Sequence, residues 1–277
     1  MSNKFFWTDH TSGELAGRDT AGTVVIIPLG ATEQHGPHLP LSVDVDIVEA
    51  VLARLQALRP DELPVVRLPT LGIGKSNEHI SFPGTLTLSA ETLLRLWMEV
   101  ADCVVRAGFR RLLFLNSHGG QGGLADALAR DVRVRHGVLA VTASTYSLGV
   151  PEGSLSEAEM RHGIHAGQEE TSVMLAFRPG LVQMDKARRF DSRSAALEQD
   201  FTRLSLQARG RLAWQIEDLN EQGACGDAAA ASAELGQRLI DCAAAGLLEL
   251  LRDMVRYDMK NLRHRAIFTT GETTDAT

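Results

Sequence analysis

Four short apolar runs alternate with longer amphipathic stretches over the first half of the chain, and this alternation is the strongest constraint on the fold. Each run is rich in β-branched or other large apolar residues, which predicts a buried strand. The predicted strands are 23–29, 65–68, 111–115 and 138–144. The stretches between them carry apolar residues at helical spacing and predict helices over 44–58, 90–107 and 124–136. This order is typical of βαβ units around a parallel sheet.

The second half of the chain has a less regular pattern. The run 165–172 opens a predicted helix that continues to Phe177, and a further helix is expected around 195–207. A long amphipathic helix is expected to begin at Asp227. The last residues, 269–277, are small and polar, so we expect them to be frayed.

The composition excludes several classes of protein. The chain has 277 residues and a net charge of −7 without a basic stripe, which argues against a nucleic-acid partner. Its three cysteines form no CxxC pair, so neither a thiol-only zinc site nor a disulfide framework is expected. No signal peptide is evident, and no apolar run approaches the roughly 20 residues that span a bilayer. We expect a cytoplasmic protein without a membrane partner, and one domain, 1–277, because no repeat or linker divides the chain.

The most distinctive segment of the sequence directly follows the first predicted strand. It runs from Pro28 to Pro40 and contains Glu33 and His35, with Asp44 shortly after it. These three side chains are plausible metal ligands. The glycines and prolines around them would restrict the loop to one backbone conformation. Open α/β sheets gather their chemistry outside the carboxyl ends of their strands, so the location suits a site.

Charged side chains also stand at two other element ends. His118 follows the third predicted strand, and His165 and Glu170 open the helix that ends at Phe177. Because the carboxyl ends of parallel strands share one edge, we expect these loops to converge with the first. Mixed imidazole and carboxylate ligands suit zinc, manganese or iron, and this many ligands suit two ions. Two ions bridged by a carboxylate and a water generate hydroxide at neutral pH and polarise a carbonyl, so the sequence predicts a hydrolase.

Each of these residues also fits a purely structural role, without metal binding or catalysis. Glu33 fits a solvated loop carboxylate, and Asp44 fits a helix N-cap in competition with Asp46. His35 and His38 could cap backbone carbonyls in a tight loop. For His38 we favour that role, or the support of a metal ligand from behind.

The later residues have similar alternatives. His118 could fill a strand-to-helix turn, and His165 and Glu170 could be ordinary residues of a first helical turn. The glycines between Ser117 and Leu124 could hold a phosphate, although they match neither GxGxxG nor GxxxxGK[ST]. Three further histidines are assigned no role: His79, His136 and His162.

Five spaced motifs resemble those of the creatininase (creatinine amidohydrolase) family. They occur in the family's order between about residue 5 and residue 250. In this sequence they read Gly30-Ala31-Thr32-Glu33-Gln34-His35-Gly36-Pro37-His38-Leu39-Pro40 with Asp44, Ser81-Phe82-Pro83-Gly84-Thr85, Asn116-Ser117-His118-Gly119-Gly120, His165-Ala166-Gly167 with Glu170-Thr171-Ser172, and the segment from Gly226 to Gly236. The resemblance implies an α/β fold, a three-layer α/β/α sandwich with a mostly parallel central sheet. It also implies a binuclear metal site, commonly zinc or manganese, in a homohexamer that hydrolyses amide-type C–N bonds of small, often cyclic substrates.

The resemblance also implies roles for individual residues. Glu33 and His118 would bind one metal ion, His35 the other, and Asp44 would bridge the two. His165 would relay protons to the leaving nitrogen, which is a general acid/base role.

Two departures from the pattern bear on the substrate. Gly119 and Gly120 stand where creatininase itself has tyrosine and a ligating glutamate, so we propose Glu170, or less favourably Glu169, as the missing carboxylate. The pocket tryptophans of creatininase have no counterpart near His165, because Trp214 lies in a different region of the sequence. We therefore expect an amidohydrolase acting on a cyclic amide or lactam, with a formamide deformylase or a peptidase as alternatives. The rival from another class is a metal-free protein that holds an anion in its glycine-rich loop.

Overall fold

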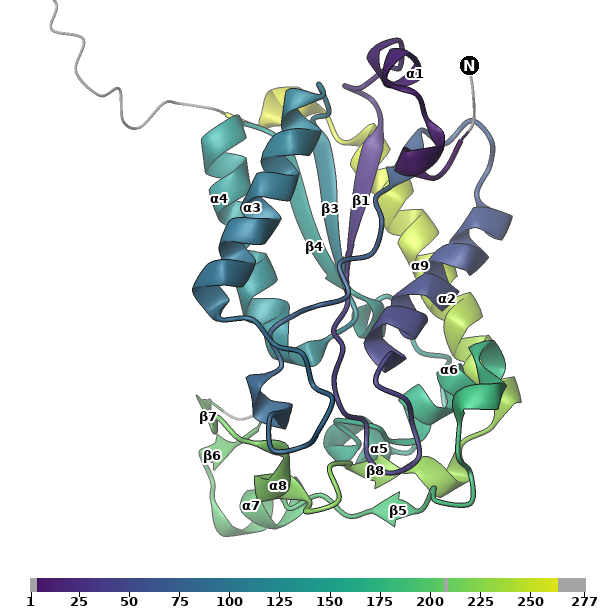
Figure 1. The fold of residues 1–277 in the computed structure, drawn as a ribbon, viewed down its shortest axis with the longest axis vertical. Helices are drawn as coiled ribbons and strands as arrows, with labels where there is room; N and C mark the ends of the chain where they lie inside the picture. The colour runs from purple at the N-terminus through teal and green to yellow at the C-terminus, as the bar shows by residue number, and fades with distance from the viewer. Residues whose placement is uncertain (1–3, 207–208, 264–277) are drawn as a thin grey trace, which may run out of the picture.

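A four-stranded parallel sheet forms the centre of the computed structural model, which describes residues 4–206 and 209–263 (Figure 1). Its strands are β1 (Val24–Leu29), β2 (Val65–Arg67), β3 (Arg111–Asn116) and β4 (Leu139–Ser144), in the order β2-β1-β3-β4. In the register of the sheet, Val24 lies opposite Val65 on one side and Arg111 on the other. Every residue of β1 and β3 is buried, as expected for parallel strands covered on both faces.

Helices cover both faces of the sheet. Successive side chains of β1 point to opposite faces and therefore pack against different helices. Val24 and Ile26 pack with α2 (Val43–Leu58) and α9 (Ala233–Arg256). Val25 and Ile27 pack on the opposite face with α3 (Ala90–Arg106) and α4 (Gly122–His136). The expected three-layer α/β/α sandwich with a parallel sheet is therefore confirmed.

The smaller elements mostly gather below the carboxyl ends of the strands, at the lower end of the molecule (Figure 1). Two short strand pairs lie there, the antiparallel β5 (Arg189–Phe190) with β8 (Gly226–Asp227) and the parallel β6 (Leu204–Ser205) with β7 (Gly210–Arg211). The helices of this region are α5 (Glu157–His162), α6 (Gln168–Phe177), α7 (Ser194–Asp200) and α8 (Ile216–Leu219). The remaining short helix, α1 (Ser12–Ala16), lies at the opposite end.

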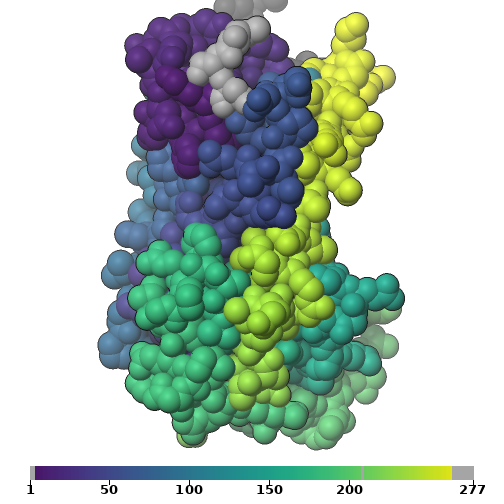
Figure 2. Space-filling view, turned by 90° about the vertical axis from the view of Figure 1, so that its right-hand side faces the viewer, coloured from purple at the N-terminus to yellow at the C-terminus, as the bar shows by residue number. Residues whose placement is uncertain are grey.

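Helix α9 joins the sandwich to this lower region, because it packs against both α2 and α6 (Figure 2). The backbones of α6 and α9 approach so closely that a Cβ at Gly236 would collide with the carbonyl oxygen of Ser172. Position 236 therefore requires glycine for packing. Since α6 carries one wall of the site described below, this contact fixes that wall against the core.

Several helix ends differ from the sequence predictions. Ser89 caps α3, and Gly137 ends α4 in the left-handed conformation, so both helices end close to the predicted ranges of 90–107 and 124–136. The last helix begins at Ala233, capped by Ser232, whereas the predicted start, Asp227, pairs in β8. Pairing with β5 takes that residue out of the helix.

The polar regions also contain more structure than predicted. The helix expected over 195–207 ends at Asp200, before β6, and the stretch 145–164 contains α5. Residues 269–277 lie outside the described residues. Within the described ranges, none of the helices combines the length and the apolar character needed to cross a membrane.

Candidate functional site

The loops that follow β1 and β3 meet the start of α6 around a pocket of about 590 Å³. All six residues singled out from the sequence are brought together here: Glu33, His35, Asp44, His118, His165 and Glu170. The carboxyl edge of a parallel sheet is where such a site was expected. Their convergence depends on the parallel pairing of β1 with β3, since that pairing places the two loops side by side.

Asp44 occupies the middle of the cluster and faces a histidine on each side. Its Oδ1 lies 3.6 Å from Nε2 of His35, and its Oδ2 lies 3.4 Å from Nδ1 of His118. Glu33 Oε1 also lies close to Nδ1 of His118, at 3.3 Å. Glu170 Oε2 lies 3.7 Å from Nε2 of His35. The side chains thus form two groups of potential ligands, Glu33 with His118 and His35 with Glu170, which share Asp44. The sequence alternative of Asp44 as a helix N-cap is wrong, because Ser42 holds that position.

Backbone carbonyls set which nitrogen of each histidine is free to bind a metal. Nε2 of His118 donates to the carbonyl oxygen of Lys75 at 2.9 Å, and Nδ1 of His35 donates to that of Glu33 at 3.1 Å. Each ring therefore directs its other nitrogen to the carboxylates, and in the neutral form of the ring that nitrogen could bind a metal ion. A hydrogen bond to the outer nitrogen is the usual way in which proteins orient a metal-binding histidine.

Several polar atoms that face the centre are buried and unsatisfied. Glu33 Oε2, His35 Nε2 and Asp44 Oδ2 have no hydrogen-bond partner within the described part of the chain. All three residues are at most 2% exposed. Buried polar atoms almost always have a partner, so three orphans on one cluster indicate a missing one. A mixed set of carboxylate oxygens and imidazole nitrogens fits zinc or manganese.

In the metal-free chain, the charges of the cluster favour protonated histidines between the carboxylates. Burial alone would lower the pKa of His35, but Asp44, Glu170 and Glu33 outweigh it and raise that pKa to about 9. Burial would also lower the pKa of His118, but Glu33 and Asp44 outweigh it and raise that pKa. Burial opposes the ionisation of Asp44, yet the two histidines hold its pKa well below the usual range. A divalent ion would take the place of these protons.

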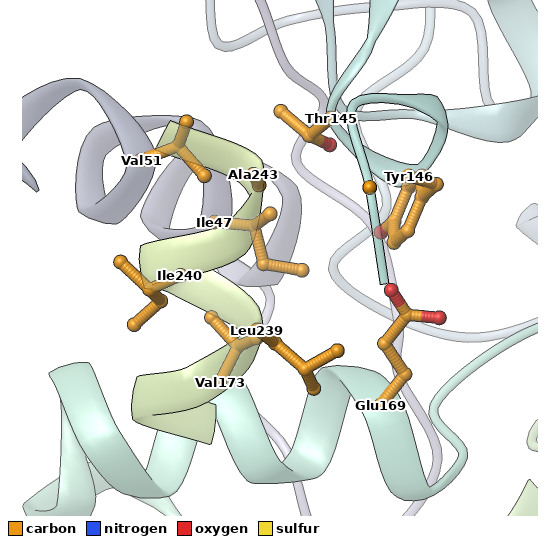
Figure 3. A pocket seen from close by; sticks show the side chains of 10 residues that line it. Ile47, Val51, Thr145, Tyr146, Glu169, Val173, Leu239, Ile240 and Ala243 are labelled. Carbon is orange, nitrogen blue, oxygen red and sulfur yellow. The ribbon is translucent and has the colours of Figure 1, made fainter. Parts of the chain in front are cut away.

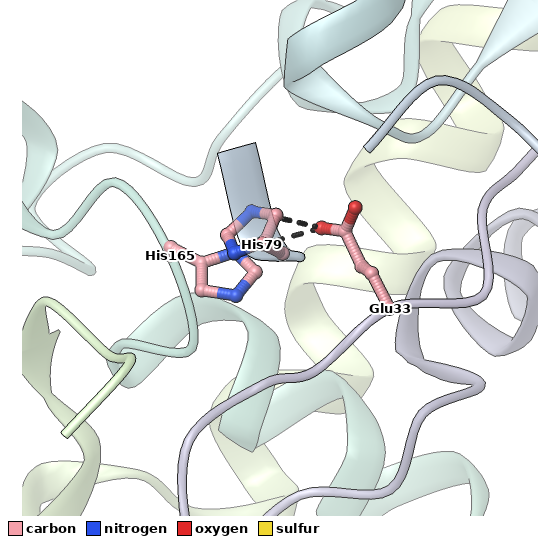
Figure 4. Close-up of side chains that lie close together, drawn as sticks. All are labelled: Glu33, His79 and His165. Atoms are coloured by element: carbon pink, nitrogen blue, oxygen red, sulfur yellow. Dashed lines mark ion pairs between the residues drawn. The ribbon is translucent and has the colours of Figure 1, made fainter. Parts of the chain in front are cut away.

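His165 lies beside the ligands and has a different environment (Figure 4). Its Nε2 donates to the carbonyl oxygen of Gln34 at 2.8 Å, which leaves Nδ1 facing Glu33 Oε1 at 3.8 Å. Burial, and then the neighbouring His35, lower the pKa of His165. The ring is therefore neutral at neutral pH, with an accepting nitrogen toward the centre.

His79, which sequence analysis assigned no role, is part of the same site. Its ring stacks on His165 with centroids 4.2 Å apart, and its Nε2 lies 3.4 Å from Glu33 Oε1. The amide of Gln34 lies 2.8 Å from its Nδ1. His79 therefore orients Glu33. The length of the loop around 70–88, within which His79 lies, was the signal that could have indicated it.

The other histidines without an assigned role lie elsewhere. His136 pairs with Asp102 at 2.6 Å, and His162 contacts Ser194 at 2.9 Å. His38 packs against Phe190 behind the ligands, and its Nε2 lies 2.9 Å from the hydroxyl of Thr171. It joins the loop to α6 through Thr171 and does not line the pocket.

The pocket has an aromatic wall that the sequence did not place there. Trp214, which lies in a different region of the sequence from His165 and was not placed in the pocket, lines it with its ring centroid 6.3 Å from that of His79. Tyr146 lines it as well, and its hydroxyl donates to Glu170 Oε1 at 2.7 Å. Both come from segments that are polar or irregular in sequence, where no local pattern marks a pocket wall.

The two neighbouring glutamates at the start of α6 differ in direction. Glu170 faces His35, whereas Glu169, which also lines the large pocket, borders a small apolar pocket formed with side chains of α2, α6 and α9 (Figure 3). Burial, followed by the charge of Glu170, raises the pKa of Glu169 to about 7. Glu170 is therefore the better placed of the two to face a metal ion.

Glu78 also approaches the site from the loop before α3. Its Oε1 lies 3.5 Å from Nε2 of His118, and a Cβ at Gly120 would collide with it. The glycine at 120 thus leaves room for a carboxylate that comes from another loop. The hydroxyl of Ser117, at the start of the glycine-rich segment, donates to the carbonyl oxygen of Asp44 at 2.6 Å.

Comparisons with known proteins agree with this geometry. The family model described as "Creatininase: Creatinine amidohydrolase" matches residues 8–251. A mycofactocin precursor peptide peptidase of Mycobacterium tuberculosis (strain ATCC 25618 / H37Rv) is 32% identical over 221 residues, which cover 78% of this chain and 79% of that protein. A creatinine amidohydrolase of Pseudomonas putida is 30% identical over 204 residues, which cover 67% and 76% of the two chains.

Solved structures show the same fold. A putative creatinine amidohydrolase from Bacteroides fragilis NCTC 9343 superposes with a TM-score of 0.73 at 24% identity, covering 93% of this chain and 99% of that one. A structure described as "Creatininase Mn" gives a TM-score of 0.71 at 23% identity over 92% and 100% of the two chains. The match of the family model over most of the sequence, together with these relatives, shows that the chain belongs to the creatininase family.

Proposed function

We propose that this chain is a metal-dependent hydrolase of amide C–N bonds that works with two divalent ions, zinc or manganese, with iron as a further possibility. The observation that carries the proposal is the shared position of Asp44 between two ligand groups, in which three polar atoms (Glu33 Oε2, His35 Nε2 and Asp44 Oδ2) are buried and unsatisfied. Glu33 and His118 would hold one ion, His35 and Glu170 the other, and Asp44 both. Such ions would activate water and polarise the amide carbonyl.

The protein's own residues would orient the substrate and move the proton. Nδ1 of His165 is the accepting nitrogen of a neutral ring that faces the centre, and Nε2 is held by the carbonyl of Gln34. His165 could therefore take up a proton at Nδ1 and deliver it to the departing nitrogen, as a general acid/base. His79 and the amide of Gln34 would keep Glu33 and the His165 ring in place.

The size and lining of the pocket favour a peptide over a single small ring as the substrate. A pocket of about 590 Å³ bounded by Trp214, Tyr146 and Leu212 has room for more than one five-membered lactam. A relative at 32% identity is named as a peptide peptidase. A cyclic amide, or a formamide, is the second candidate, supported by the relative that is named as a creatinine amidohydrolase. A homohexamer is a further proposal that rests on the family resemblance, and a cytoplasmic location is one that rests on the cysteine pattern and the N-terminal sequence.

The first test is elemental analysis of the purified protein beside a hydrolysis screen over short peptides, lactams and formamides. We expect about two ions per chain and a hit that chelation abolishes. Asp44→Ala should lose both metal and activity, whereas Asp253→Ala, on the exposed side of α9, should keep both. A metal-free, inert protein that retains its fold would overturn the proposal and favour an anion-binding protein.

Two further variants separate the roles of the residues. His165→Ala should retain its metal and lose turnover, and a variant with normal turnover would rule out the proton relay. Glu170→Gln should bind one ion tightly instead of two. Two tightly held ions in that variant would show that another group completes the second site.

A further inference from the structure

Glu159 is a buried carboxylate outside the ligand cluster, and it lies beneath the loop that carries His165. The residue belongs to α5 and is 7% exposed. Its Oε1 accepts a hydrogen bond of 2.6 Å from the backbone N–H of Gln168, and its Oε2 accepts one of 2.8 Å from that of Asp227. Both oxygens are therefore occupied by backbone donors, which come from segments far apart in the sequence.

These two donors stand just beyond a backbone bridge that holds His165. The N–H of Cys225 donates to the carbonyl oxygen of His165 at 2.7 Å, and the reverse bond measures 3.4 Å. Gln168 follows His165 on one segment, and Asp227 follows Cys225 on the other. The carboxylate of Glu159 thus links the two segments by a second set of hydrogen bonds, two to three residues after the bridge between His165 and Cys225.

Glu159 also caps the helix that carries Glu170. Helix α6 begins at Gln168, and the residue before it, Gly167, has no side chain with which to accept a bond from the first turn. The carboxylate of Glu159 supplies that acceptor and places a negative charge at the positive end of the helix. The first turn of α6 is thereby fixed in the orientation that directs Glu170 toward His35.

Three glycines surround the carboxylate and leave room for it alone. A Cβ at Gly163, Gly167 or Gly226 would in each case collide with Glu159 Oε1. Gly226 also has a φ of +129°, which side chains rarely adopt. Glycine at all three positions indicates that the loops are shaped around this carboxylate.

The loop above Glu159 is under backbone strain. Ala166 has a φ of +54°, the one positive value at a non-glycine residue within 4–206 and 209–263. Its N–H donates to Glu170 Oε2 at 2.6 Å, so the strained residue is bound to a potential metal ligand. A conformation of this kind persists only when its surroundings hold it, and the bond of Glu159 to Gln168, two residues after Ala166, is one of the contacts that hold it.

We propose that Glu159 is a positioning residue of the reaction, which fixes the His165 ring and the first turn of α6 through its bonds to Gln168 and Asp227. This inference rests on the proposed function, since it assigns Glu159 a role in supporting the groups that perform it. Glu159 itself does not line the pocket of the ligands and is not expected to touch the substrate.

The variant Glu159→Gln tests this role because it keeps the shape and replaces one acceptor oxygen by a donor. An amide NH₂ would then face a backbone N–H, so one of the two bonds is lost and that end of the loop is released. Displacements of about 1 Å cost about 10²-fold in turnover. We expect kcat to fall by about that factor with KM little changed, and affinity for added Mn²⁺ to fall by about tenfold because Glu170 is less well held.

The matched control is Glu157→Gln, an exposed residue of the same helix, which should behave as the parent chain. Hydrogen exchange followed by mass spectrometry supplies a readout that does not depend on activity. In Glu159→Gln, peptides covering 163–172 and 224–229 should exchange faster, while those covering β1 and β3 should not change. If Glu159→Gln does not fold, Glu159→Asp, which keeps the charge on a shorter arm, is measured in its place with the same expectations.

The outcomes separate this inference from the proposed function. Parental exchange, Mn²⁺ affinity and kcat in Glu159→Gln would overturn the inference alone. A fall in thermal stability with kcat unchanged well below the melting temperature would also overturn it, because it would make Glu159 merely structural. A parent chain that binds no Mn²⁺ and hydrolyses nothing would overturn the proposed function, whatever the exchange rates of the variant.

Discussion

Removal of the proposed metal ions should destabilise the folded chain by an amount that the buried polar atoms determine. Glu33 Oε2, His35 Nε2 and Asp44 Oδ2 are buried without a partner. Each such atom costs about 1–3 kcal/mol, which gives a total on the order of 3–9 kcal/mol when no ion is bound. Protons on His35 and His118 partly compensate the carboxylates, since both pKa values are raised. We therefore expect a loss near the lower end, roughly 3 kcal/mol.

The assay is thermal unfolding before and after removal of metal by a chelator, followed by re-addition of zinc or manganese. For a domain of this size, about 3 kcal/mol corresponds to a fall in melting temperature of roughly 6–12 °C. Asp44→Asn should have a low melting temperature that the chelator does not change, and Asp253→Ala should respond as the parent chain does. Equal melting temperatures for the parent chain with and without metal would refute the reasoning, because the orphaned atoms would then have other partners.

Three further predictions concern packing, pH and reactivity. Gly236→Ala should lower the free energy of unfolding by roughly 1–3 kcal/mol in denaturant titrations, because its Cβ would collide with the backbone of α6. Burial alone would raise the pKa of Glu49, but hydrogen bonds from Arg67 and Thr70 hold that pKa below its ordinary value. Glu49→Gln should therefore have a lower free energy of unfolding than the parent chain at pH 7. This difference should shrink as the pH falls below about 4.5. Burial raises the pKa of the Cys225 thiol to about 11, so this thiol should not react with Ellman's reagent at pH 8 until the chain is unfolded.

Each of these predictions has an internal control and a contrary outcome. Gly123→Ala, in α4 with open space around it, should not destabilise, and equal stability of the two glycine variants would show that α6 and α9 can move apart. A Glu49→Gln deficit that is the same at pH 3 and pH 7 would exclude the charged pair as its cause. Cys103 is exposed and should react at once, so equally prompt reaction of Cys225 would mean that its surroundings open in the native state.

The sandwich was largely predictable because its strands and helices are defined by local patterns. The apolar runs before Gly30 and before His118 became β1 and β3, and the helix predicted over 124–136 ends at His136. The side chains at the ends of these strands could be placed near each other because parallel strands share an edge. Glu170 could be put forward because it stands at the start of a helix.

The features that could not be predicted from the sequence depend on contacts between segments that are far apart in the chain. His79 and Trp214 reach the pocket from long polar or irregular stretches, where sequence alone does not show which side chain turns inward. Asp227 looked like the start of a helix because helical spacing follows it, but its N–H bonds to Glu159 and its segment pairs with β5. No local pattern reports a partner almost seventy residues away. Tertiary hydrogen bonds decided these cases against local preference.

The shared position of Asp44 has a consequence for how the chain would acquire the proposed ions. The potential ligands come from the loop after β1, the first turn of α2, the loop after β3 and the start of α6, so the complete set exists only after those segments have docked. An ion that joins them closes several long loops at once and behaves like a set of cross-links. Loading should therefore be a late step of folding, and exchange of a bound ion should be slow because it requires these segments to separate locally.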